Sequence, residues 1–314
     1  MRQFSIVMPV YNKEKYVEKS IESILNQNYR YFELIIIDDG SKDKSSEIIK
    51  KIATKDNRIK YVLQKNQGES VARNNGIKIA ANEYIAFLDS DDLWLPDFLE
   101  VMNRLINQYP DAGAVGCAYF HEPVLENTYI EAMAQVKNKK VIYIKNYFDF
   151  VLHHEQHLTA SSTIVRRDVF EKVGGFPVGL KNWVDLDLWA RIGLFYEIVF
   201  TEEKCAIYND LPDSVSKVSV KLHAPTFDNY QLFMHDSEIT KERKKWFKEY
   251  VIYEKMYSAY QQYMLDHDGK KAFFELLPYW KTRFNRKSYI SMMLQFILST
   301  EKFYKILNLI GKGK

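Results

Sequence analysis

Three carboxylates fall within residues 89–92, directly after the apolar run 84–88. Like charges this close repel one another, and a shared cation relieves the repulsion. Mg²⁺ and Mn²⁺ prefer oxygen ligands and typically bind through one or two carboxylates together with substrate phosphates. Asp89 and Asp91 are therefore candidate ligands of Mn²⁺ or Mg²⁺. The alternative is an acidic turn before the next helix, in which Asp92 serves the helix dipole.

Two further polar clusters follow other apolar runs. Asp39, in the segment 38–41, can accept hydrogen bonds from a base or a sugar, or it can belong to an ordinary Asp-Gly turn. In the segment 67–76, Gly68 permits a close backbone approach, Ser70 is expected to cap a helix, and Arg73 lies one turn into it. The spacings match neither a P-loop nor the G-x-G-x-x-G fingerprint, which argues against both kinds of nucleotide site.

The segment 183–191 predicts a helix with two acids between two tryptophans, Trp183 and Trp189. An aspartate in a dry aromatic pocket has a raised pKa, which suits a general base. Asp185 and Asp187 are the candidates, and Asp185 is favoured by helix phase and by its distance from Arg191. The alternative is an ordinary packed helix that Asp185 caps.

Alternating strand and helix patterns must position these residues. They predict an α/β fold with a mainly parallel sheet between helices, whose ligands lie outside the carboxyl ends of the strands. Residues 121–160 are expected to form loops and perhaps one helix, and the chain beyond 236 only helices. We expect strands at 4–8, 32–37, 59–63, 84–88, 114–119, 162–166 and 198–200, and helices at 13–26 (capped by Asn12), around 48–52, and at 70–80, 96–109, 167–173 and 184–195.

Composition narrows the class of protein. The chain has 314 residues, 46% of them hydrophobic and 27% charged, which is typical of one or two globular domains. Two cysteines provide no disulfide framework, and the sequence contains neither an apolar signal segment nor a run of 18 apolar residues. We expect a cytoplasmic protein.

In order along the chain, these motifs resemble the nucleotide-sugar-dependent glycosyltransferases of family two, which have the GT-A fold. The resemblance covers residues 3–215 and rests on 5–13, 37–41, 66–75, 84–97, 166–176 and 185–191. It implies that Asp91 contacts the metal, that Asp89 lies nearer the ribose, and that Asp185 is the catalytic base, although Val184 replaces an acid that often precedes it. It further places Pro9, Val10, Tyr11, Asp39, Lys65, Gly68, Arg73 and Ser90 along the donor site, and we add Trp183, Asp187 and Trp189 as acceptor-side candidates.

The resemblance implies an inverting transfer of a single sugar, with UDP the expected carrier, to a saccharide or lipid-linked acceptor in bacterial-type surface polysaccharide or glycolipid synthesis. No nucleic acid partner is expected, and the Q-x-x-R-W signature of processive synthases is absent. Two alternatives stay open. One is a sugar-nucleotide-binding subunit without turnover, and the other is a nucleotidyltransferase on a similar sheet.

The C-terminal part of the chain differs in composition. Residues 241–314 hold 16 Lys or Arg against 7 Asp or Glu, together with 16 of the 46 aromatic residues. We therefore divide the chain into a catalytic domain at 1–235 and a helical, basic and aromatic region at 236–314. A basic amphipathic helix can lie on the inner face of a membrane, or its apolar face can pack on the catalytic domain or a second subunit.

Overall fold

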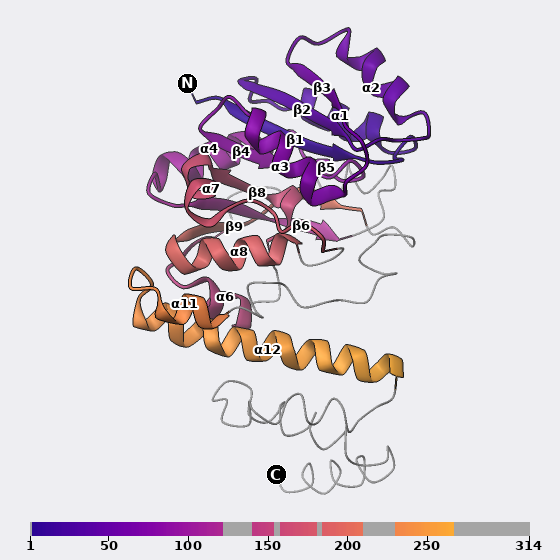
Figure 1. The fold of residues 1–314 in the computed structure, drawn as a ribbon. Coiled ribbons are helices and arrows are strands. Elements are labelled where there is room, and N and C mark those ends of the chain that lie inside the picture. Colours follow the sequence, from indigo (N-terminus) through magenta and orange to yellow (C-terminus); the bar gives the residue numbers. More distant parts are fainter. Residues whose placement is uncertain (1, 122–139, 154–157, 181–183, 210–229, 267–314) are drawn as a thin grey trace, which may run out of the picture.

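A computed structural model describes residues 2–121, 140–153, 158–180, 184–209 and 230–266, with side chains to residue 256. Its strands form one mixed sheet of nine strands, flanked by helices (Figure 1). The strands are β1 (Phe4–Val10), β2 (Phe32–Asp38), β3 (Ile59–Leu63), β4 (Tyr84–Phe87), β5 (Leu93–Trp94), β6 (Ala114–His121), β7 (Val141–Ile144), β8 (Thr163–Arg166) and β9 (Ile198–Tyr208).

Strand order in the sheet is β3-β2-β1-β4-β8-β6-β9-β5, with β7 also paired to β9. The block β3-β2-β1-β4 is parallel throughout, whereas β8 runs antiparallel to β4 and β6. The expected α/β class with a mainly parallel central sheet is thus confirmed. The helices are α1 (Val17–Leu25), α2 (Ser45–Ala53), α3 (Glu69–Ile79), α4 (Phe98–Gln108), α6 (Tyr147–His153), the 3₁₀ turn η1 (Ala160–Ser162), α7 (Arg167–Val173), α8 (Val184–Phe195), α11 (Tyr230–His235) and α12 (Lys241–Asp266).

Alternate side chains of the parallel strands enter two separate cores, because successive residues of a strand point to opposite faces. On β2, Leu34 and Ile36 join the core with α1 and α4, whereas Ile35 and Ile37 join the core with α3, α7 and α8. A parallel sheet covered on both faces explains why these strands are almost continuously apolar.

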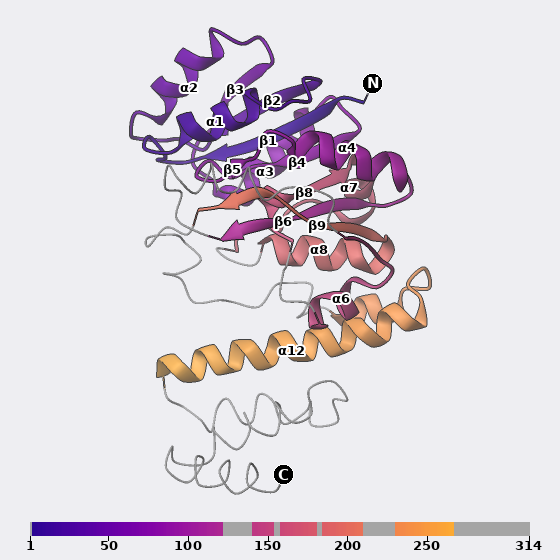
Figure 2. The same ribbon diagram turned by 180° about the vertical axis from the view of Figure 1, so that it is seen from behind.

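The helix α12 lies beyond α6 and α8 as seen from the sheet, in both views (Figures 1 and 2). Phe247, Tyr250 and Val251 are buried in the same core as Trp189 of α8. The start of the region 236–314 therefore packs on the catalytic part, as one of the sequence alternatives expected. The rest of this region, residues 267–314, lies outside the described residues, and the alternative of membrane contact stays open there.

Several expected boundaries are wrong. The helix predicted from residue 13 begins at Val17, because Asn12 adopts a φ of 54° and its side chain accepts a hydrogen bond from Lys42 N instead of capping the helix. The helix predicted from Pro96 begins at Phe98, since the Pro96 carbonyl accepts a hydrogen bond from Asn28 N.

The second half of the sheet departs most from expectation. The segment 121–160 contributes the strand β7, and the strand predicted at 198–200 extends to Tyr208 because it pairs with β5, β6 and β7. The two-residue strand β5 was not expected. None of the helices in the described ranges is long and apolar enough to cross a membrane.

Candidate functional site

The polar clusters predicted from the sequence meet at one edge of the sheet. Parallel register aligns Val10 of β1 with Asp38 of β2, and Asp38 in turn with Leu63 of β3. The strand β4 ends beside β1, with Phe87 opposite Val7. The segments after these four strands therefore share the carboxyl edge, where ligands bind in open parallel sheets.

Asp39 fixes the loop that follows β3. Its carboxylate, 3% exposed, accepts hydrogen bonds from Gln64 Nε2 at 2.7 Å, Gln67 N at 2.9 Å and Gly68 N at 2.8 Å. A carboxylate offers about four acceptor sites, so a base N–H can still be accommodated. Asp39 thus has a loop-forming role that the sequence did not predict.

Gly68, with a φ of +93°, occupies the N-cap position of α3 and requires the freedom of glycine. A Cβ there would meet nothing within 4 Å, so this backbone borders open space. The expected cap Ser70 is wrong: it lies in the first turn, and its buried Oγ has no hydrogen-bond partner in the described structure.

Arg73 projects from α3 beneath the acidic cluster. Only 2% of its side chain is exposed, and Nη2 lies 2.5 Å from Asp89 Oδ1 and also pairs with Glu69. Its guanidinium lies over the Phe176 ring, 5.0 Å from the centroid. Burial lowers its pKa, but the carboxylates of Asp89 and Glu69 outweigh that effect and raise it. In the structure Arg73 therefore reaches the acidic cluster.

The three acids of the cluster take three different partners. Asp89 pairs with Arg73, and Asp91 Oδ2 lies 2.5 Å from Lys13 Nζ. Asp92 accepts hydrogen bonds from Ser161 Oγ at 2.6 Å and Asn209 N at 2.9 Å, which tie the loop to η1 and β9. The helix-dipole alternative for Asp92 is therefore wrong.

Burial acts on two of these acids. Burial is the largest influence on the pKa of Asp91 and raises it, and the charge of Lys13 offsets part of this increase. The pKa of Asp92 is raised further, by complete burial and then by the charges of Asp89 and Asp91.

On α8 the two candidate bases have different surroundings. Asp185, at the start of the helix, is half-buried and caps Leu186 N at 2.9 Å. Burial raises its pKa, against the lowering effect of Arg73 and with a further raising effect from Asp89. Asp187 instead points at Arg191, with Oδ2 2.7 Å from Nη2, and Arg191 in turn bonds the Gly175 carbonyl. These surroundings suit Asp185 to base catalysis and Asp187 to holding α8 in place.

The other predicted site residues differ in their exposure to solvent. Trp189 is fully buried in the core, which leaves it no surface for an acceptor, and Trp183 lies outside the described residues. Pro9 and Val10 are buried at the end of β1, Ser90 is buried in the acidic loop, Lys65 is exposed, and Tyr11 is 41% exposed at the rim.

Sequence reasoning missed several groups around the acids. Lys13 pairs with Asp91 of the acidic cluster, and Glu69 pairs with Arg73. Tyr119 and Tyr147 lie in the electrostatic field of Asp185, and burial raises the pKa of Tyr119 to about 12. Lys13 lies in the segment 5–13 that carries the resemblance, so its proximity to the first strand end was the available signal.

The donor set fits a hard cation shared with a substrate. In the described ranges no three His, Cys, Asp or Glu side chains are arranged to hold a metal by themselves. Mg²⁺ and Mn²⁺ need only one or two carboxylates when phosphate oxygens complete the shell. Asp91, 17% exposed and paired with Lys13, meets that requirement.

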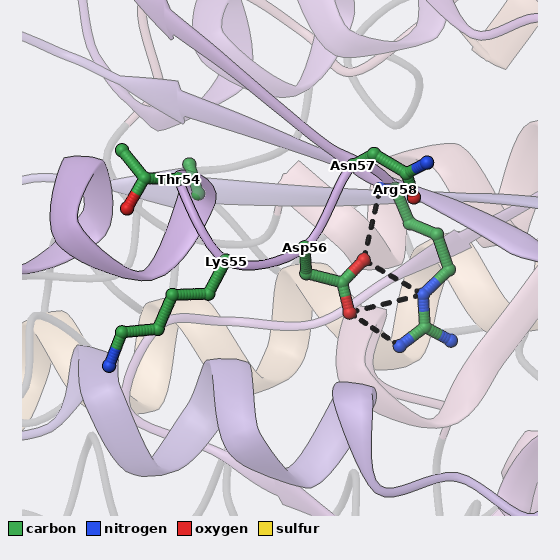
Figure 3. A pocket seen from close by; sticks show the side chains of 6 residues that line it. Thr54, Lys55, Asp56, Asn57 and Arg58 are labelled. Carbon is green, nitrogen blue, oxygen red and sulfur yellow. Dashed lines mark hydrogen bonds and ion pairs between the residues drawn. The ribbon is translucent and has the colours of Figure 1, made fainter.

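A hollow of about 590 Å³ lies elsewhere, at the turn from α2 into β3 (Figure 3). Its wall carries the ion pair between Arg58 Nη2 and Asp56 Oδ2 at 2.7 Å. It lies at the amino end of β3 and contains none of the predicted site residues, so we assign it no part in the chemistry.

Curated proteins resemble the chain to different extents. An uncharacterised glycosyltransferase of Methanocaldococcus jannaschii is 30% identical over 305 residues, 95% of this chain and 90% of that protein. Glycosyltransferase GlyA of Streptococcus pneumoniae is 36% identical over 137 residues, 41% of this chain. In GlyA and five other relatives, the matched segment makes up only 15 to 40% of the protein.

Solved structures show the same fold. TarS 1–349 of S. aureus, crystallised with UDP-GlcNAc, matches with a TM-score of 0.68 at 16% identity, over 94% of this chain and 91% of that one. Mannosyltransferase PcManGT of Pyrobaculum calidifontis, in complex with GDP-Man and Mn²⁺, matches with a TM-score of 0.57 at 15% identity, over 93% and 86%. The sequence profile "Glycosyl transferase family 2" matches residues 5–174, and with these likenesses in fold we conclude that the chain belongs to glycosyltransferase family 2 and has the GT-A fold.

Proposed function

We propose that this protein transfers a single sugar from a UDP-sugar to an acceptor hydroxyl, with inversion at the anomeric carbon. The observation that carries the proposal is the convergence of two acids from different elements on the buried Arg73: Asp89 pairs with it, and the charges of Asp185 and Arg73 act on each other. Support also comes from the fold neighbours, one of which was crystallised with UDP-GlcNAc.

The donor would lie across the ends of β1 to β4. Tyr11 offers an exposed ring to the base at the rim, and Asp39 offers remaining acceptor sites. The backbone at Gly68 leaves open space at the N-terminus of α3, which favours the diphosphate. Lys65 is exposed near this position and adds positive charge. These groups fix where the leaving diphosphate lies relative to the acids.

Asp91 would hold Mn²⁺ or Mg²⁺, with Asp89 beside it. The ion, when bound with the donor, supplies positive charge that stabilises the departing diphosphate. Asp89 is already neutralised by Arg73, so that Asp91 is the carboxylate left for the ion once Lys13 withdraws.

Asp185 would accept the proton of the acceptor hydroxyl. The acceptor oxygen then bonds the anomeric carbon from the face opposite the diphosphate, and the bond from that carbon to the phosphate oxygen breaks with its electron pair going to UDP. An α-linked donor therefore gives a β-glycoside. Because burial disfavours the charged carboxylate, the acidic limb of the kcat profile should lie at higher pH than an unperturbed aspartate would give.

Replacing the base tests the assignment. Asp185→Asn should lower kcat about 10²- to 10⁴-fold, the usual contribution of a general base, and leave UDP affinity unchanged. The measurement is UDP release from a panel of UDP-sugars with Mn²⁺, alongside UDP binding by calorimetry. Folded Asp187→Asn should keep turnover, because Asp187 pairs with Arg191. Normal turnover by Asp185→Asn would refute the base.

The same assay separates the alternatives. Release of pyrophosphate in place of UDP would identify a nucleotidyltransferase. Binding of UDP-sugars without release under any acceptor would identify a non-catalytic subunit.

The acceptor is proposed to be a saccharide, free or lipid-linked, used in surface polysaccharide or glycolipid synthesis on the inner face of the membrane. The C-terminal region is tested by truncation after residue 266, because a shorter chain would lose Phe247 and Tyr250, which belong to the core. Loss of co-sedimentation with anionic vesicles upon truncation would support membrane contact, whereas loss of a dimer in light scattering would support self-association. Retention of both properties would exclude the segment 267–314 from either role.

A further inference from the structure

We infer that Lys13 is a built-in counter-ion of Asp91, which keeps divalent metal off this carboxylate until a donor diphosphate draws the lysine away. Metal and donor would then bind cooperatively. The inference rests on the proposed function and adds to it an order of binding. It follows from the contact of Lys13, from the bracing of its loop and from the contrast with Arg73.

The contact places an ammonium group where the ion would bind. Lys13 Nζ lies 2.5 Å from Asp91 Oδ2, and the side chains are 29% and 17% exposed. A cation on this oxygen would share it with the ammonium, and a cation on the other oxygen of the carboxylate would still lie close to the same positive charge, so both are disfavoured while Lys13 stays in place. A metal ion that binds without the donor must therefore displace Lys13 and break a half-buried, charge-assisted hydrogen bond.

The loop that carries Lys13 is braced from the next strand end. Lys13 N donates to Ser45 Oγ at 2.8 Å, and Asn12 N donates to Ser41 Oγ at 3.1 Å. Lys42 N returns a hydrogen bond to Asn12 Oδ1 at 2.8 Å. Asn12 is the sole non-glycine residue with positive φ in the described ranges, a conformation that persists only where the surroundings impose it. The backbone that aims Lys13 at Asp91 is therefore fixed, while its four-carbon stem can swing.

Arg73, the partner of Asp89, is held much more firmly than Lys13. It is 2% exposed, pairs with both Asp89 and Glu69, and lies over the Phe176 ring. Lys13 is more exposed and carries a compact ammonium on a flexible stem. The structure thus provides one fixed and one releasable cation for two neighbouring acids.

The releasable cation couples the two ligands. A diphosphate beside Asp91 offers Lys13 another anionic partner, so its arrival lowers the penalty for freeing Asp91. By linkage, each ligand then tightens the other by the same factor. Without Lys13, Asp91 is open to metal at all times, and the coupling diminishes.

The test measures Mn²⁺ affinity of the full chain by electron paramagnetic resonance of free Mn²⁺, with and without UDP. We expect Lys13→Met to bind Mn²⁺ alone about two- to fivefold more tightly than the wild type, the range for losing a competing ion pair of this exposure. We further expect UDP to enhance Mn²⁺ binding less in this variant than in the wild type. Lys15→Met, which removes the same charge from an exposed position of the same loop, should behave as the wild type.

Three outcomes would overturn the inference. One is equal or weaker Mn²⁺ binding by Lys13→Met, with UDP and Mn²⁺ still binding to the wild type; that result leaves the proposed function standing. Another is an equal gain in Lys15→Met, which would show a general charge effect. If the wild type binds neither ligand, the proposed function fails and the inference with it. Asp91→Asn should abolish Mn²⁺ binding in both backgrounds, which locates the ion.

Discussion

The sheet edge at the ends of β1 to β4 and the helical layer of α6, α8 and α12 differ in how their buried acidic and polar side chains are paired. At the sheet edge each acid has a partner from another segment, as in the pairs of Asp89 with Arg73 and of Asp91 with Lys13. In the helical layer, Asn146 Nδ2, Tyr147 Oη and Trp189 Nε1 are buried without a hydrogen-bond partner in the described structure.

The difference follows from how the two regions are built. The sheet edge consists of short motifs placed side by side by strand register, so its polar groups meet whenever the sheet forms. The helical layer joins segments about 100 residues apart through apolar packing, with Phe148 and Phe247 ring centroids 4.9 Å apart. Such packing tolerates a polar atom where ring area outweighs it. The helix α12 lies beyond the family match at 5–174 and still completes the core beside the proposed base.

The largest effect is expected where α12 enters the core. Phe247→Ala should lower the free energy of unfolding by about 3–5 kcal/mol, because it empties a fully buried site. Lys248→Ala, the exposed neighbour, is the matched control and should change it little. Chemical denaturation measures both. Equal stability of the two variants would mean that α12 is an appendage to the catalytic part.

Local patterns were enough to predict several elements together with their boundaries. The strand at 59–63 and the helices at 167–173 and 184–195 have the expected boundaries, since apolar periodicity and flanking turns define them within the segment itself. The position of the acids at one sheet edge followed from the parallel order of β1 to β4.

The strands in the second half of the sheet depend on partners that are distant in the sequence. The strand β9 extends to Tyr208 only because β5, β6 and β7 pair with it, and β5 has just two residues. The partners of Asp91 and Asp39 could not be predicted either, because each contact forms between residues of two different loops. No spacing in the sequence reports that Lys13 reaches Asp91 or that Asp39 holds the Gly68 backbone.

A smaller effect is expected at Asp39. Asp39→Ala should lower the free energy of unfolding by about 1.5–3 kcal/mol, because two backbone amides and Gln64 lose a charged acceptor. It should also raise the KM for the donor, since the loop before α3 loses its anchor. Lys65→Ala, in the same loop, controls for stability and should leave the unfolding transition in place. An unchanged transition in Asp39→Ala would show that the loop forms without it.

The smallest effect gives the sharpest contrast, because one chemical change is made in both regions. Tyr61 Oη donates to Asp38 Oδ2 at 2.8 Å at the sheet edge, whereas Tyr147 Oη in the helical layer has no partner in the described structure. Tyr61→Phe should therefore lower the free energy of unfolding by about 1–2 kcal/mol, and Tyr147→Phe should raise it by up to about 1 kcal/mol.

Opposite signs in thermal and chemical unfolding would establish that the Tyr61 hydroxyl is hydrogen-bonded and the Tyr147 hydroxyl is not. Destabilisation by Tyr147→Phe would mean that its hydroxyl is bonded after all, and the contrast between the regions would disappear. The same pair of variants thus distinguishes a buried hydroxyl that apolar packing tolerates from one that is hydrogen-bonded.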